Sequence, residues 1–173
     1  MARYNNNVRP VRDVRSAVDV KFHAVIIQLV NLDEKQQRLA TTMDFKITWV
    51  DQFLHWHPEM FGGIEQIVLP TDAVWMPDLM VWNSVSEKFY SWYHVKLTIQ
   101  YDGTIVWVPP GLVETSCDVN TRKFPFDEQK CEIRLGSWAL TKDLVNIQHN
   151  KPIDSRNGIV SIKFRTKSKS TLK

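Results

Sequence analysis

The chain of 173 residues is long enough for one domain with a proper core and too short for two comfortable ones. Its net charge of +3 is mild, and its basic residues are scattered among acidic ones except at the two ends, which argues against nucleic-acid binding. No apolar run reaches about 18 residues, so the sequence predicts no membrane-spanning helix. Residues 1–10 lack the apolar stretch of a signal peptide, and we expect any export signal to have been removed or never to have been present.

Alternation of apolar and polar residues dominates the chain and predicts β-strands. At most a short helix fits near residues 1–8. Residues 39–53 carry large apolar side chains at odd positions, namely Leu39, Met43, Phe45, Ile47, Trp49 and Phe53. Segments HVKLTIQ and TIVWV flank Tyr-Asp-Gly and predict a hairpin over residues 94–108. The segments CEIRLGSW and IVSIKF alternate in the same way. Many short strands separated by Pro and Gly predict an all-β, two-sheet β-sandwich.

The two cysteines, Cys117 and Cys131, have thirteen residues between them. They are too few for a four-thiolate zinc site, and spacing alone leaves two unrelated buried thiols or one disulfide. A disulfide here would remove roughly 3 kcal/mol of unfolded-state entropy and would persist only in an oxidising compartment. Inside the loop, Pro125 lies between two aromatic residues and is a candidate for a cis peptide in a tight turn. Asp127 can close a turn onto nearby backbone.

Motifs of enzymes and cofactor sites are absent from the sequence, which predicts neither an enzyme nor a cofactor. His55 and His57 would share one face of a strand and could hold a metal, but no third ligand is evident, so two surface histidines are the favoured interpretation. The acidic pairs 33–34 and 127–128 lie beside lysines and are typical of solvated turns.

Several motifs together resemble Cys-loop receptors, the pentameric ligand-gated ion channels. The most specific is the segment from Cys117 to Cys131 with FPFD inside; the others are VWMPDLMVWNS (Val74–Ser84), GSWAL, ITWVD, VPPG (Val108–Gly111) and NLDEK (Asn31–Lys35). The likeness runs from about residue 4 to the end and is nearest to nicotinic acetylcholine receptor extracellular domains. It implies a two-sheet β-sandwich with a short N-terminal helix, a Cys117–Cys131 disulfide, and assembly as a ring of five.

The resemblance also implies a ligand site lined by aromatic side chains at a subunit interface. Trp82 stands where loop A usually has tyrosine, and Trp138 matches the loop B aromatic; both belong to the principal face. Trp49 matches the loop D aromatic on the complementary face, where Gln100, Val106 and Val108 take loop E positions. Asp78 resembles the aspartate that fixes the loop B backbone. Aromatic faces around a small cavity attract a quaternary ammonium, which points to a small cationic amine as ligand. Without the resemblance, periodicity places Trp49 in the core, and Trp82 and Trp138 default to the core as well.

Two loops match the family's coupling elements, which press on the membrane domain of a channel and transmit gating. One is the turn at Asp33 and Glu34, and the other is the loop residues Phe124, Pro125, Phe126 and Asp127.

The sequence departs from the family pattern after GSWAL. Only 35 residues follow Trp138, with no second cysteine pair and no tyrosine. We expect a deletion of loop F, the family's ninth strand and loop C, with Lys151–Gly158 as a short replacement turn. The alternative is that the last strand is the ninth and the tenth is lost; that loss would leave a gap in the outer sheet, because the tenth strand normally lies between the seventh and ninth. Since loop C is the lid over the agonist, acetylcholine affinity should be low or absent.

The sequence therefore predicts one extracellular ligand-binding-type domain over residues 1–173, soluble as given and lacking a transmembrane domain, with an impaired transmitter site. A homopentamer is the expected assembly. Such a chain is either an excised receptor domain or a secreted protein similar to the acetylcholine-binding proteins, and the apolar FPFD loop favours descent from a channel subunit. Two alternatives stay open: a competent transmitter-binding protein, or a purely structural ring whose tryptophans are interface packing.

Overall fold

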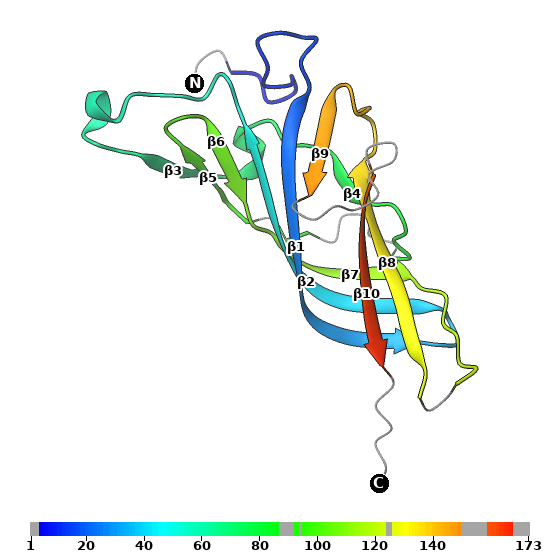
Figure 1. Cartoon of the computed structure of the whole chain (residues 1–173). Coiled ribbons are helices and arrows are strands. Elements are labelled where there is room, and N and C mark those ends of the chain that lie inside the picture. Colours follow the sequence, from blue (N-terminus) through cyan, green and yellow to red (C-terminus); the bar gives the residue numbers. More distant parts are fainter. Residues whose placement is uncertain (1–3, 87–91, 94, 124–125, 150–158, 168–173) are drawn as a thin grey trace.

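A computed structural model describes residues 4–86, 92–93, 95–123, 126–149 and 159–167 of the chain. They form two β-sheets packed as a sandwich, which confirms the predicted all-β class (Figure 1). The strands are β1 (Val18–Asp33), β2 (Arg38–Val50), β3 (Gln66–Leu69), β4 (Leu79–Val81), β5 (Leu97–Gln100), β6 (Thr104–Trp107), β7 (Pro110–Ser116), β8 (Glu128–Ser137), β9 (Val145–His149) and β10 (Ile159–Lys167). Two 3-10 turns, η1 (Pro58–Phe61) and η2 (Thr71–Ala73), complete the described elements.

The larger sheet is built around the long antiparallel pair β1 and β2, which runs from Lys21↔Thr48 to Asp33↔Arg38. Its strand order is β3-β5-β6-β2-β1-β9, and β7 pairs with the first half of β2. Strand β9 adds in parallel to the start of β1. The β5–β6 hairpin forms at the predicted Tyr-Asp-Gly turn, where Gly103 adopts a φ of 88° that favours glycine.

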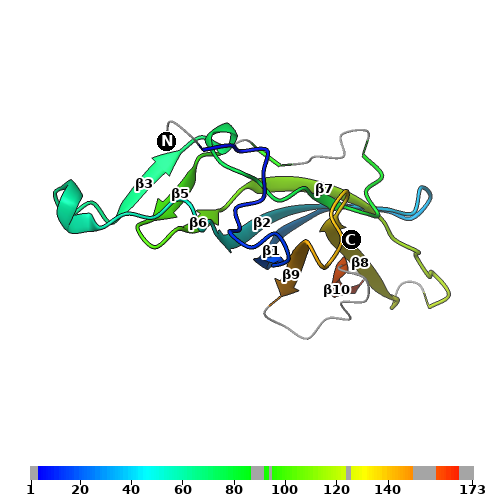
Figure 2. The same ribbon diagram turned by 90° about the horizontal axis from the view of Figure 1, so that it is seen from above.

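The smaller sheet has the order β10-β8-β4. Strand β8 is its centre, because β10 pairs with it from Ile159↔Gly136 to Lys167↔Glu128 and β4 pairs with its other edge. Figure 2, the view from above, shows β3, β5 and β6 at one end of the molecule and β8 and β10 at the other.

The core lies between the two sheets, and the alternation in β2 explains which side chains enter it. Odd-numbered residues of β2 from Leu39 to Trp49 are buried, while the even-numbered residues are exposed or half-buried. Ile133 and Leu135 of β8 are fully buried from the opposite sheet. The period-2 prediction for this strand is confirmed, except that Phe53 lies beyond the strand and is half exposed.

The prediction of a short helix near residues 1–8 is wrong for residues 4–8, which form turns; residues 1–3 lie outside the described residues. The Asn5 side chain accepts a hydrogen bond from the backbone N–H of Asn7 at 3.0 Å. Side-chain acceptors of this kind compete with helical hydrogen bonds, and three consecutive asparagines therefore favour turns here.

Tyr4 attaches this N-terminal segment to the sandwich. Its hydroxyl donates to Asp51 Oδ2 at 2.6 Å and accepts from the Trp75 backbone N–H at 3.0 Å. Asp51 is fully buried and also accepts from the Phe53 N–H at 2.9 Å. Burial raises the pKa of the Tyr4 phenol well above its ordinary value, and the hydrogen bond to Asp51 adds to the increase.

Candidate functional site

Trp82 and Trp138 form an exposed pair of indoles at one end of the smaller sheet. Trp82 directly follows β4 and Trp138 directly follows β8, so their backbones lie at opposite ends of the antiparallel β4–β8 pair, and their side chains meet across it. The Trp82 N–H donates to the Arg134 carbonyl at 2.8 Å, and the Trp138 N–H donates to the Asp78 carbonyl at 3.2 Å. The ring centroids are 5.2 Å apart with an angle of 41° between the planes. With exposures of 42% and 63%, both rings offer aromatic surface to a ligand.

Asp78 holds the backbone on both sides of Trp138. Its Oδ1 accepts from the Ser137 hydroxyl at 2.5 Å, and its Oδ2 accepts from the Ala139 N–H at 2.6 Å. The Ser137 oxygen in turn accepts from the Leu140 N–H at 3.0 Å. The bond to the Ala139 N–H is of the kind expected of Asp78, and together these bonds fix the path of the chain that carries the Trp138 ring.

This arrangement suits cation binding better than catalysis. An indole face attracts a cation most strongly among the aromatic side chains, and two tilted faces present two such surfaces to one guest. Two charged groups lie beside the pair: the Asp78 carboxylate next to the Trp138 backbone, and Arg134, whose guanidinium pairs with Glu132 at 3.3 Å. Among the described residues, no cluster of three or more His, Cys, Asp and Glu side chains could hold a metal. His55 and His57, the pair considered from the sequence, lie in the segment between β2 and η1.

Trp49, which was expected on the complementary face, lies in the core and apart from this pair within one chain. It is 1% exposed and packs edge-on against Trp75, with ring centroids 6.4 Å apart. The physical reason is the pleat of β2, which turns Trp49 to the same face as Phe45 and Ile47. Strand periodicity alone predicts this core position.

Gln100, Val106 and Val108 lie on the outward face of the larger sheet. Val106 sits between Thr48 of β2 and Thr98 of β5 and is half-buried, while Gln100 and Val108 are exposed. Because β5 and β6 belong to a different sheet from β4 and β8, these residues do not meet the Trp82–Trp138 pair within one chain.

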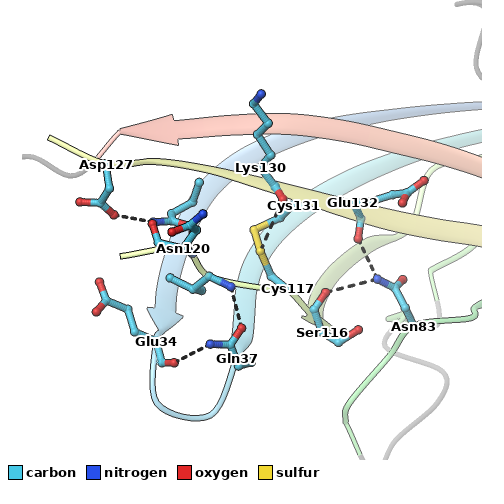
Figure 3. The surroundings of a disulfide bond; sticks show 12 residues. Glu34, Gln37, Asn83, Ser116, Cys117, Asn120, Asp127, Lys130, Cys131 and Glu132 are labelled. Atoms are coloured by element: carbon cyan, nitrogen blue, oxygen red, sulfur yellow. Dashed lines mark hydrogen bonds between the residues drawn. A yellow bond between two sulfur atoms is a disulfide. The ribbon is translucent and has the colours of Figure 1, made fainter. Parts of the chain in front are cut away.

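The predicted Cys117–Cys131 disulfide is present and joins the end of β7 to β8, with a Cα–Cα distance of 5.2 Å (Figure 3). Within the loop it closes, the Gln129 side chain exchanges two hydrogen bonds with the Asn120 backbone, at 2.8 and 3.0 Å. Asp127 is 2% exposed and accepts a hydrogen bond from the Gln129 amide, so it is buried rather than solvated. Phe126 is 84% exposed. Phe124 and Pro125 lie outside the described residues.

Gln37 links the β1–β2 turn to this disulfide loop and was not anticipated from the sequence. Its backbone carbonyl accepts from the Cys117 N–H at 2.9 Å, and its side-chain oxygen accepts from the Val119 N–H at 2.6 Å. Its side-chain amide donates to the Glu34 carbonyl at 3.0 Å (Figure 3). In the same turn Asp33 accepts from the Gln36 N–H at 2.8 Å. The backbone φ of Gln37 is 55°, the only positive value at a non-glycine position in the described residues. The sequence showed no sign of this link beyond a polar turn.

Comparison with known proteins gives one consistent family. The family model of the neurotransmitter-gated ion-channel ligand binding domain matches residues 1–173. The neuronal acetylcholine receptor subunit alpha-5 of Homo sapiens is 36% identical over 155 residues, covering 89% of this chain and 33% of the relative. The alpha-3 subunit of Carassius auratus is 39% identical over 145 residues, covering 84% and 28%. The alpha-type subunit unc-38 of Caenorhabditis elegans is 30% identical over 152 residues, covering 88% and 30%.

The chain thus spans about a third of the length of the curated relatives it matches. The matched family is one of ion channels and not of enzymes. Within the part of the chain that the structure describes, no helix has the length and apolarity needed to cross a lipid bilayer.

Proposed function

Because this chain belongs to the family of neurotransmitter-gated ion-channel ligand binding domains, of nicotinic acetylcholine receptor type, we propose that it is an extracellular ligand-binding domain with a weakened site for a small cationic amine. The observation that carries the proposal is the exposed Trp82–Trp138 pair, held by Asp78. An extracellular place agrees with the disulfide, since oxidising compartments preserve such bonds.

The Trp82–Trp138 pair is half of the proposed site, and a neighbouring copy supplies the other half. Gln100, Val106 and Val108 lie on the other sheet, as a head-to-tail contact between identical subunits requires. A heterologous contact of this kind closes into a ring when its rotation permits. We therefore propose a homopentamer in which the outward face of β5 and β6 meets the indole pair of the next subunit.

The proposed site lacks a lid because loop F, the family's ninth strand and loop C are deleted. Support comes from the topology, in which β10 pairs directly with β8 over its whole length. That is the position of the family's tenth strand beside its seventh, and only residues 150–158 separate β9 from β10. With Trp49 in the core as well, the site has two aromatic walls from one subunit and stays open to water.

The proposed affinity follows from these two walls. A cation–π contact contributes about 0.5–1 kcal/mol at an exposed site and about 2 kcal/mol when desolvated. Two contacts therefore give at most about 4 kcal/mol, which corresponds to a Kd of about 1 mM.

A Trp138→Ala variant tests the assignment, with Phe126→Ala as the matched control because Phe126 is an exposed aromatic residue of the disulfide loop, outside both halves of the proposed site. Tetramethylammonium binding is followed by NMR titration, and the assembly by light scattering. We expect Trp138→Ala to abolish the tryptophan-dependent shifts and leave the ring intact, while Phe126→Ala changes neither. Loss of the ring in Trp138→Ala would instead identify the indoles as interface packing in a structural ring.

A further inference from the structure

A large cavity lies at the end of the sandwich opposite the disulfide loop, away from the indole pair. Its volume is about 950 Å³, which is at the upper end of the range for small-molecule sites. The N-terminal segment, the β2–β3 connection and strands β3 and β5 form its walls. Figure 1 shows this connection, with η1, at the far end of the molecule from the tip of β8.

The walls are mainly aromatic and aliphatic. Tyr4, Phe53, Trp56 and Phe61 contribute aromatic rings, and aliphatic side chains contribute most of the rest. The polar members of the lining are Asn5, Arg9 and His55. Phe53 and Phe61 are 49% and 57% exposed, so the cavity leaves apolar surface in water that a ligand could cover.

Hydrogen bonds hold the walls in place without a ligand. The Trp56 N–H donates to the Tyr101 carbonyl at 3.0 Å, and its indole N–H donates to the Ile64 carbonyl at 2.6 Å. The Tyr4 hydroxyl is fixed by Asp51 at 2.6 Å. A cavity preformed in this way avoids much of the ordering cost of binding.

The charged side chains of the cavity lining are positive only. Its lining contains no carboxylate, whereas Arg9 belongs to it. The Arg9 guanidinium donates to the carbonyls of Ser16, Val14 and Leu144 at 2.8, 2.9 and 3.2 Å, which fixes its position. No carboxylate of the described residues pairs with it. The three carbonyls, which lie outside the lining, take three of the five guanidinium N–H donors, so two donors remain for an anion.

We propose that this cavity binds a lipophilic carboxylate, with the apolar body against Phe61 and Trp56 and the carboxylate facing Arg9. The assignment is independent of the cation site, because it uses different residues and the opposite ligand charge.

Calorimetric titration with dodecanoate, below its micellar concentration, tests the proposal, with dodecan-1-ol and dodecyltrimethylammonium as probes of the head group. We expect dodecanoate to bind at least fivefold more tightly than either probe. Phe61→Ala should weaken dodecanoate binding about tenfold, because half of a phenylalanine surface is lost from the contact. Met60→Ala is the matched control, since Met60 is adjacent and 77% exposed but outside the lining, and it should change nothing.

Arg9→Gln should abolish the preference for the carboxylate over the alcohol, and Arg9→Lys should retain it. If Arg9→Gln disturbs the N-terminal segment, the Phe61 and Met60 variants still decide the site. Equal binding of the anionic and cationic probes, equal effects of Phe61→Ala and Met60→Ala, or no heat with dodecanoate would each overturn the proposal. Self-association that Phe61→Ala abolishes and dodecanoate does not affect would also overturn it, in favour of a face that contacts a second copy.

Discussion

Substitution of Asp78 tests whether one carboxylate positions the Trp138 ring. Asp78→Ala removes two acceptors, one 2.5 Å from the Ser137 hydroxyl and one 2.6 Å from the Ala139 nitrogen. Hydrogen bonds to a charged group contribute about 1.5–3 kcal/mol each. Because Asp78 is only half-buried and water can replace part of each contact, we take the lower end and expect a loss of about 2–3 kcal/mol. Asp78→Asn keeps one acceptor oxygen and should lose about half as much.

Two readouts check this prediction. Urea unfolding measures the change in free energy, and far-ultraviolet circular dichroism reports exciton coupling between the Trp82 and Trp138 rings. Asp78→Ala should weaken the coupling, because the segment after β8 is released. Asp72→Ala is the control, since Asp72 is exposed and its change should stay within about 0.5 kcal/mol. An Asp78→Ala protein with unchanged stability and unchanged coupling would refute the positioning role.

Gln37, Trp49 and Tyr4 make contacts elsewhere in the fold that can be tested in the same way. Gln37→Ala should cost about 1–2 kcal/mol and speed hydrogen exchange at the Val119 amide, whereas Gln37→Gly should recover about 1 kcal/mol because glycine tolerates the positive φ. Trp49→Phe should lower the free energy of unfolding and leave cation binding unchanged, because Trp49 is a core residue. The pKa of Tyr4 is higher in the folded than in the unfolded state, so its contribution to stability is complete at pH values below the unfolded-state pKa of about 10. Stability should therefore fall as pH rises above about 10, and Tyr4→Phe should flatten that dependence.

Each of these three has a distinct contrary result. Exchange at Val119 that is unaffected by Gln37→Ala would show that the side-chain contact is not maintained in solution. Weaker cation binding in Trp49→Phe would return Trp49 to the ligand site. A stability profile above pH 10 that is identical in Tyr4→Phe would mean that another group dominates there.

The sequence predicted the sandwich because strand burial leaves a direct trace. Alternation along β2, the turn at Gly103 and the pattern of β8 all follow from which face meets the core. The pairing of Cys117 with Cys131 was implied by the resemblance, and the structure confirms it.

Other features depend on contacts that no local pattern records. The N-terminal helix failed because asparagine side chains form turns at residues 5–7. Trp49 had two interpretations, one from a family motif and one from periodicity, and its burial agrees with the second. The role of Gln37 needs partners about 80 residues away in the chain, such as Val119, so only the folded topology reveals it.

In the proposed function, the exposed pair of indoles binds a small cationic amine weakly in an assembled ring. The most direct test is a calorimetric titration of the protein with acetylcholine, after light scattering has established the mass of the assembly. We expect a pentamer with a Kd of about 1 mM or weaker. Submicromolar binding would contradict it, because two open aromatic walls cannot supply that affinity.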